Sequence, residues 1–262
     1  MTSNLLTIKI GDKLLSRCRY GWMISTGPFI GKCFELYGEY SESEVSVFKT
    51  YVTLGDYVID VGANIGDLTL PLSEIVGATG KVFACESHPE VFNVLCANLA
   101  LNDVKNVKVI NAFIADNPNV DTASAVWGKY AYVSEKWEPA FVALDKLNFE
   151  KLNFLKVDVD GSELAVLQSG VESIKKFRPV LYFENDTKEK SQPLLAFVLG
   201  LGYRIFFHPA PIFQPDNFYE NPVNAWAPRN IVSLMMLALP PDMVAPKDLR
   251  EVRKSDDWWD LG

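Results

Sequence analysis

A strand followed by a glycine loop carries the clearest chemical signal in the sequence. Residues Val58–Gly66 read Val-Ile-Asp-Val-Gly-Ala-Asn-Ile-Gly, an apolar strand that ends in Gly62-x-x-x-Gly66 and leads into a helix. Glycines at such a turn let backbone N–H groups approach a ligand closely. Glu86 lies 20 residues after Gly66, at the end of the next expected strand. A carboxylate there can accept hydrogen bonds from both hydroxyls of a ribose, so these features predict a nucleoside site.

Two residues of this segment narrow the choice of ligand. Asn64 stands where a dinucleotide-binding Gly-x-Gly-x-x-Gly loop has its middle glycine, so the pyrophosphate of NAD is a less natural ligand. Asp60 lies inside the strand, and its buried charge needs a partner, for which a ligand ammonium or backbone N–H groups would serve. An ordinary strand-end cap is the alternative for each acidic residue taken alone. Their order along the chain favours the nucleoside site.

Alternating strands and helices position these residues. Apolar runs without strict polar alternation, typical of strands buried on both faces, are Tyr57–Val61, Lys81–Cys85, Val107–Ile110, Phe154–Val157, Pro179–Phe183, Tyr203–Phe207 and Ile231–Leu237. Helices are predicted over Ser43–Val52, Ser87–Leu101 and Ser162–Gln168. Ser87 and Glu90 form a capping box at the start of the second helix. Strands that alternate with helices indicate a doubly wound α/β sheet.

The chain is expected to have three parts. They are an irregular and helical N-terminal cap (1–52), a main domain (53–240) and a C-terminal tail (241–262). In the tail we expect Trp258 and Trp259 to dock on the domain. The polar and aromatic segment Asn117–Pro139 has no clear period and is predicted to be a lid over the site, with a surface insertion as the alternative.

Composition and charge exclude several classes of protein. With 48% hydrophobic and 22% charged residues, the 262-residue chain is neither disordered nor fibrous. Its 25 Lys and Arg against 33 Asp and Glu give a net charge of −8, which argues against nucleic acid as a main partner. Four scattered cysteines and two histidines offer no zinc-ligand spacing and suit a cytoplasmic protein with reduced thiols. No signal peptide and no apolar run of roughly 20 residues is found, so no membrane span is expected.

Five segments together resemble class I S-adenosylmethionine-dependent methyltransferases, and more narrowly the FkbM family. The segments are Val58–Gly66, Lys81–Glu90, Asn98–Asn102, Leu152–Leu164 and Arg178–Asn185. The resemblance implies a class I methyltransferase (Rossmann-like) α/β sandwich. Its sheet would have seven strands, mostly parallel, with the last strand antiparallel and with helices on both faces.

The resemblance also implies which residues bind S-adenosylmethionine. The glycine loop would face the methionine part, Glu86 would hold the ribose, and Asn111 and Ala112 would border the adenine. Asp158 would lie near the methyl group. The complete expected set is Asp60, Gly62, Ala63, Asn64, Gly66, Thr69, Glu86, Ser87, Asn111, Ala112 and Asp158.

Methyl transfer from a sulfonium is an in-line displacement, so the enzyme must align the acceptor and help its hydroxyl to lose a proton. The candidate catalytic residues at strand ends are Asp158, Glu184 and His208, with Asp160 as a further candidate. A lone histidine beside aromatic residues is more often structural. Lys156 is expected to pair with one of these acids.

A divalent-metal site is a second expectation at the same strand ends. Asp158, Glu184 and Asn185 follow neighbouring strands and resemble the metal site of some class I O-methyltransferases. Hard oxygen ligands of this kind suit Mg²⁺, which would polarise the acceptor oxygen. A hydrogen-bonded structural cluster is the alternative.

The sequence therefore predicts an S-adenosylmethionine-dependent O-methyltransferase that acts on a hydroxyl of a sugar, a glycan or a natural product. One alternative is an NAD-dependent oxidoreductase, against which the missing middle glycine argues. Another is a non-catalytic nucleoside-binding or interaction domain of the same fold, against which the intact Asp60, Gly62 and Glu86 argue. Neither the acceptor nor the oligomeric state can be derived from the sequence.

Overall fold

A seven-stranded sheet forms the centre of the computed structural model, which describes residues 7–116, 139–228 and 231–260. The strand order is β11-β12-β10-β9-β4-β5-β6. The strands are β4 (Tyr57–Val61), β5 (Lys81–Cys85), β6 (Val107–Ile110), β9 (Phe154–Val157), β10 (Val180–Glu184), β11 (Arg204–Pro211) and β12 (Val232–Leu239). Each strand of the series β10, β9, β4, β5 and β6 pairs in parallel with the next one. Strand β12 is antiparallel to both β10 and β11. The predicted sheet with an antiparallel last strand is confirmed.

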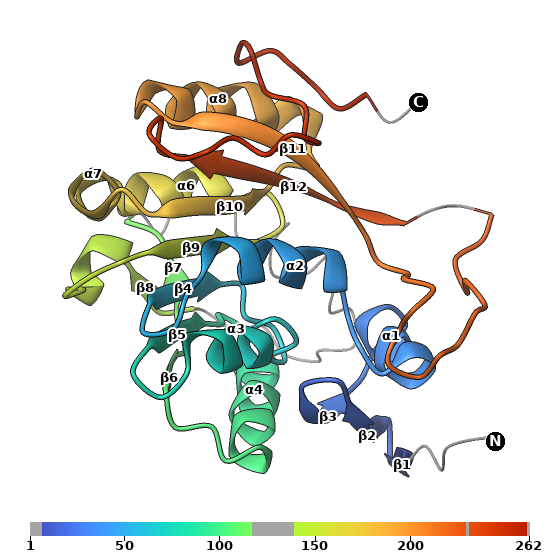
Figure 1. Ribbon diagram of the computed structural model, residues 1–262. Helices are drawn as coiled ribbons and strands as arrows, with labels where there is room; N and C mark the ends of the chain where they lie inside the picture. Colours follow the sequence, from blue (N-terminus) through green and yellow to red (C-terminus); the bar gives the residue numbers. More distant parts are fainter. Residues whose placement is uncertain (1–6, 117–138, 229–230, 261–262) are drawn as a thin grey trace.

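Helices cover both faces of this sheet (Figure 1). One face packs against α2 (Glu42–Tyr51), α3 (Thr69–Val76) and α4 (Pro89–Leu101). The other packs against α6 (Glu163–Ser169), α7 (Val171–Phe177) and α8 (Lys188–Gly200). The strands are buried on both faces because successive side chains point to opposite sides, which explains their nearly continuous apolar sequences.

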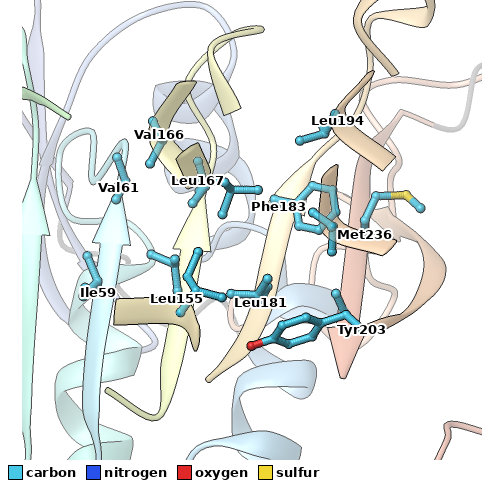
Figure 2. Packing of buried hydrophobic residues seen from close by; sticks show 14 of the residues in the cluster. Ile59, Val61, Leu155, Val166, Leu167, Leu181, Phe183, Leu194, Tyr203 and Met236 are labelled. Atoms are coloured by element: carbon cyan, nitrogen blue, oxygen red, sulfur yellow. The ribbon is translucent and has the colours of Figure 1, made fainter. Parts of the chain in front are cut away.

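The core on the α6–α8 face shows how the strand register arranges the apolar residues. Ile59, Leu155 and Leu181 occupy matching positions on β4, β9 and β10, and all three are fully buried. Figure 2 shows them pointing to the same side of the sheet, with Leu194 of α8 over the far end of the cluster. The hydroxyl of Tyr203 donates to the carbonyl of Pro179 at 2.8 Å, so its polar atom is satisfied inside an apolar layer.

The N-terminal cap differs from the irregular structure that the sequence predicts. Residues 7–25 form a three-stranded antiparallel sheet of β1 (Thr7–Ile10), β2 (Lys13–Cys18) and β3 (Gly21–Ser25), followed by α1 (Ile30–Tyr37). Ile10 pairs with Lys13, so Gly11 and Asp12 make a two-residue hairpin turn with Gly11 at a φ of 64°. The cap is therefore more regular than expected, because the turn at Gly11 and Asp12 lets β1 and β2 pair as a hairpin.

Asn98 of α4 and Asn102, which directly follows α4, attach this cap to the main domain. The side-chain oxygen of Asn98 accepts from the Ile24 amide at 2.7 Å, and its nitrogen donates to the Ile24 carbonyl at 3.0 Å. Asn102, one turn later, makes the same pair of bonds to Trp22, both at 2.7 Å. The two side chains therefore satisfy the backbone amides and carbonyls of β3 that a neighbouring strand would otherwise pair with. These bonds fix the cap beside the carboxyl end of the sheet.

The C-terminal segment docks on the sheet edge, as expected for Trp259. Its ring nitrogen donates to the carbonyl of Asn185 at 2.6 Å, and its ring packs edge-on against Phe207 at 4.8 Å between centroids. The amide of Val252 donates to the Ile205 carbonyl at 2.8 Å, so the segment runs along the outer side of β11. None of the described helices is long and apolar enough to cross a membrane.

Candidate active site

A pocket opens at the carboxyl ends of β4, β5 and β9, where the glycine loop, the acidic end of β5 and the N-terminal cap meet. Its lining residues are Ile30, Tyr40, Val61, Gly62, Asn64, Asp67, Cys85, Glu86, Ser87, His88, Ala112, Phe113, Ile114, Lys156, Asp158, Val159, Asp160 and Val166.

The glycine loop can take this shape only with glycine at Gly62. The residue has a φ of +79°, and a Cβ atom there would lie 1.8 Å from the backbone oxygen of Asp158. The amides of Gly62 and Ala63 both donate to the carbonyl of Cys85, at 2.9 and 3.0 Å. The loop is therefore held against the ends of β5 and β9, with its backbone facing the pocket.

We expect Gly62→Ala to lower the free energy of unfolding by roughly 2–4 kcal/mol, because both the φ and the contact with Asp158 forbid a Cβ atom. Chemical denaturation measures the loss. The matched control is Gly200→Ala at the end of α8, where no heavy atom lies within 4 Å of an added Cβ. That variant should remain within about 1 kcal/mol of the wild type. Equal stability of the two variants would contradict the claim that the loop requires glycine at position 62.

Glu86 is the buried acid at the end of β5, only 7% exposed. Its two carboxylate oxygens accept from the amides of Asn64, at 3.0 Å, and His88, at 2.8 Å. Burial raises the pKa of Glu86 to about 7, although both amide bonds act to lower it. Since each oxygen can accept more than one hydrogen bond, the carboxylate can also receive two ligand hydroxyls. The side chain of Asn111 donates to the carbonyls of Glu86 and Ser87, at 2.9 and 3.1 Å, and holds this turn.

The start of α4 differs from the predicted capping box. The helix begins at Pro89 with His88 as its N-cap, and no side chain makes a capping bond. The His88 amide is satisfied by Glu86 instead. The capping-box prediction was wrong because the N-cap is His88 and not Ser87, so Ser87 and Glu90 do not stand at the two positions that a capping box joins.

Asp60 has its partners inside the protein. It is completely buried, and the hydroxyl of Thr69 donates to its Oδ2 at 2.6 Å. Nζ of Lys156 lies 3.0 Å from Oδ1 of Asp60 and 3.8 Å from Oδ2 of Asp158. It also donates to the carbonyl of Gly62 at 3.3 Å. Burial alone would lower the pKa of Lys156, but the carboxylates of Asp60 and Asp158 outweigh it and raise this pKa above its usual value.

The predicted cofactor residues fall into two groups. Those that line the pocket are Gly62, Asn64, Glu86, Ser87, Ala112 and Asp158. Those outside the lining, which support the loops behind it, are Asp60, Ala63, Gly66, Thr69 and Asn111. The expected pairing of Lys156 with an acid is confirmed.

The lining also includes residues that sequence reasoning missed. Ile30 and Tyr40 reach the pocket from the N-terminal cap, and Phe113 and Ile114 from the short strand β7 (Phe113–Ile114). Their sequences carry no local motif, because only the tertiary fold brings them here. Asp67 gives a clearer signal, since it follows the glycine loop directly. Of the expected lid, Asn117–Pro139, residues 117–138 lie outside the described part of the chain.

The three predicted catalytic residues do not share the pocket. Asp158 lines it with a side chain that is 25% exposed. Glu184 and His208 lie beside Met235 in the strand register but do not line the pocket in the described structure. Nδ1 of His208 lies 2.8 Å from the hydroxyl of Tyr182, and burial lowers the pKa of His208 to about 4. His208 is therefore neutral near pH 7 and held in a buried network.

The expected metal ligands Asp158, Glu184 and Asn185 also do not lie together in the structure. The side chain of Asn185 donates to Ser191 of α8 at 3.0 Å. Because side chains alternate along a strand, Glu184 faces the opposite side of the sheet. Within residues 7–116, 139–228 and 231–260, no group of three or more His, Cys, Asp and Glu side chains is arranged to hold a metal ion.

Glu44 of α2 gives a pH-dependent prediction. It is 1% exposed, its Oε1 accepts from Ser41 at 2.7 Å, and burial, followed by the charge of Asp158, raises its pKa to about 7. A raised pKa favours the protonated form in the folded state, so the contribution of Glu44 to stability is lost as pH rises toward and beyond 7. We expect Glu44→Gln to stabilise the protein by about 1–3 kcal/mol at about pH 8 and hardly at all at about pH 5. Thermal unfolding at the two pH values measures this, and equal effects at both would contradict it.

Comparison with known proteins agrees with this arrangement. The methyltransferase FkbM domain matches residues 60–205. A tRNA(Phe) (4-demethylwyosine(37)-C(7)) aminocarboxypropyltransferase from Methanocaldococcus jannaschii is 28% identical over 142 residues, covering 47% of this chain and 55% of that protein. The chain therefore spans little more than half the length of this curated relative.

Two solved structures share the fold. A SAM-dependent O-methyltransferase from Thermotoga maritima has a TM-score of 0.50 and 14% identity, covering 93% of this chain and 89% of that one. A precorrin-6y C5,15-methyltransferase from Geobacter metallireducens has a TM-score of 0.51 and 14% identity, and the match covers 76% of this chain and 87% of that one. Since the FkbM domain covers more than half of the 262 residues and the resemblance in the sequence agrees with it, this chain belongs to the FkbM family of S-adenosylmethionine-dependent methyltransferases.

Proposed function

We propose that this chain binds S-adenosylmethionine in the pocket and transfers its methyl group to a hydroxyl of a sugar, a glycan or a natural product. The observation that carries the proposal is Glu86, a buried carboxylate at the end of β5 with each oxygen fixed by one backbone amide. We assign catalysis to residues 53–240, with the cap of residues 1–52 completing the pocket through Ile30 and Tyr40. We place the protein in the cytoplasm, which the four free cysteines support.

The residues present fit this cofactor. Glu86 has acceptor capacity left for the two ribose hydroxyls, and Ala112 offers a small apolar surface for the adenine. The glycine loop presents backbone rather than side chains at Gly62, where a Cβ atom would collide with Asp158. When bound, the cofactor supplies an electrophilic methyl group on a sulfonium.

Asp158 is the residue that we assign to the acceptor. It lines the pocket and is 25% exposed, so a hydroxyl entering from solvent can reach its carboxylate. In this role Asp158 accepts the proton of the acceptor hydroxyl and orients its oxygen. Lys156, 3.8 Å away, holds the carboxylate in place. His208 does not line this pocket but a separate one beside α2, and its Nδ1 lies 2.8 Å from the hydroxyl of Tyr182, so we assign it a structural role.

A Mg²⁺ ion held by Asp158 and Glu184 is a separate prediction, made from the sequence. Asp158 directly follows β9 and Glu184 is the last residue of β10, where Val157 pairs with Phe183, but Glu184 does not line the pocket in the described structure. Turnover that persists in excess EDTA would contradict the ion. Loss of turnover with EDTA and its return with Mg²⁺ would support it.

A second candidate reaction comes from the Methanocaldococcus jannaschii relative, an aminocarboxypropyltransferase that acts on tRNA(Phe). Transfer of an aminocarboxypropyl group uses the other end of the same cofactor and leaves 5′-methylthioadenosine instead of S-adenosylhomocysteine. The net charge of −8 argues against an RNA acceptor, because negative charge repels a phosphate backbone.

Analysis of both products tests the proposal. The protein is incubated with methyl-labelled S-adenosylmethionine and either sugars and natural products with free hydroxyls or tRNA, and products are identified by mass spectrometry. We expect a labelled methyl ether and S-adenosylhomocysteine. Formation of 5′-methylthioadenosine would support the second candidate. Binding of the cofactor without any product would favour a non-catalytic nucleoside-binding domain.

A further inference from the structure

We propose that Asp67 supplies the carboxylate that binds the ammonium group at the methionine end of the cofactor. This inference rests on the proposed function, and it transfers to Asp67 a role that the sequence alone suggests for Asp60. The first residue after the glycine loop thereby becomes a determinant of ligand specificity.

The position of Asp67 suits this role. It directly follows Gly66, precedes α3, and lines the pocket together with Tyr40 of the cap. The glycine loop is where the resemblance to the family places the methionine part. Asp67 is therefore an acidic side chain of the pocket that directly follows the loop expected to face the methionine part.

One oxygen of Asp67 lacks a partner in the protein. Its Oδ1 is buried and accepts no hydrogen bond from any described residue. No Lys, Arg or His nitrogen within the described ranges forms an ion pair with Asp67, although the charge of Lys156 acts on it from farther away. Burial raises the pKa of Asp67 to about 7, which shows that its ionised form is poorly compensated. A cationic donor would satisfy both the hydrogen bond and the charge.

Asp60 cannot serve in its place. Its Oδ2 accepts a hydrogen bond from the hydroxyl of Thr69 at 2.6 Å, and its Oδ1, which accepts no hydrogen bond from the described residues, forms an ion pair with the ammonium of Lys156 at 3.0 Å. Asp60 is also completely buried and does not line the pocket in the described structure. Lys156 therefore pairs with Asp60 in the place of the ligand ammonium that the sequence suggested. Of these two acids, Asp67 is the one that forms no ion pair with a cationic side chain within the described residues.

The charge around Asp67 selects the ammonium over the carboxylate of the methionine end. The ammonium of Lys156 has the largest charge effect on Asp67 and lowers its pKa, whereas the negative charges of Asp60 and Asp158 both raise it. A ligand carboxylate beside three carboxylates would be repelled, whereas an ammonium would be attracted.

A comparison of two ligands tests the inference on the intact protein. The probes are S-adenosylhomocysteine and its deaminated analogue, in which hydrogen replaces the amino group, and affinities are measured by calorimetry. The wild type should prefer S-adenosylhomocysteine by about 10- to 100-fold, the range for a hydrogen bond to a charged group. Asp67→Asn should remove most of that preference by weakening only S-adenosylhomocysteine. Asp160→Asn, which changes another acid of the pocket lining, should retain the preference.

Other outcomes overturn the inference in distinguishable ways. Equal affinity of the wild type for the two ligands overturns it without any variant, even if Asp67→Asn fails to fold. Equal weakening of both ligands in Asp67→Asn overturns it as well, because the loss would then be structural. A wild type that binds neither ligand overturns the proposed function itself. Glu86→Gln should weaken both ligands to the same extent, because the ribose is common to them.

Discussion

Glu86→Ala is expected to weaken the binding of S-adenosylhomocysteine by roughly 1–3 kcal/mol, because two ribose hydroxyls lose their acceptor. The substitution also leaves the amides of Asn64 and His88 without the carboxylate that now accepts from them. Both effects act on the turn that shapes the pocket. Calorimetry on the folded variant measures the loss.

The control for this prediction is a neighbouring acid outside the pocket lining. Glu90 lies on the exposed first turn of α4, and Glu90→Ala removes the same charge without touching the turn. Binding should be unchanged in that variant. A folded Glu86→Ala variant that binds as tightly as the wild type would remove the main support for the nucleoside site.

Lys156→Met is expected to lower the free energy of unfolding by about 3–5 kcal/mol, the cost of leaving a buried charge without its partner. Lys156 is 2% exposed and Asp60 is completely buried, so water cannot replace the lost ammonium. The same ammonium joins β4, the glycine loop and the end of β9 through Asp60, Gly62 and Asp158. The loss should therefore affect both stability and the shape of the pocket.

Two variants separate the charge from the side chain. Lys151→Met changes an exposed lysine that donates to the carbonyl of Gly55, and it should have little effect on unfolding. Adding Asp60→Asn to Lys156→Met should restore part of the lost stability, because the unpaired charge is then removed. Urea denaturation of the three variants provides the comparison. A Lys156→Met protein as stable as the wild type would show that the pair is not needed.

The central sheet could be predicted from sequence because its strands are buried on both faces and therefore read as apolar runs. The main difference is β11, predicted over Tyr203–Phe207 and found over Arg204–Pro211. The residues by which β11 is longer include Pro209 and Pro211, which have no amide hydrogen to donate. An edge strand tolerates them because its outer amides have no partner strand within the sheet.

The site was only partly predictable, for a different physical reason. Gly62 and Glu86 lie in one βαβ unit, so their spacing along the chain determines their spacing in the fold. Ile30 and Tyr40 reach the pocket only because Asn98 and Asn102 attach the cap to α4. The partner of Asp60 was not predictable either, because Lys156 lies on a distant strand that the sheet register places opposite it.

The C-terminal segment that runs along β11 also bears on how copies of this chain behave toward one another. An uncovered edge strand offers unpaired amides and carbonyls that recruit strands from other molecules into aggregates. Here Phe207 and Ile205 already pair through their backbone with Arg250 and Val252. The salt bridge from Arg204 to Glu251, at 2.8 Å, holds the two segments in register. The segment thus covers the edge strand and prevents it from pairing with another molecule. We expect its removal to cause precipitation at high concentration before it alters the pocket.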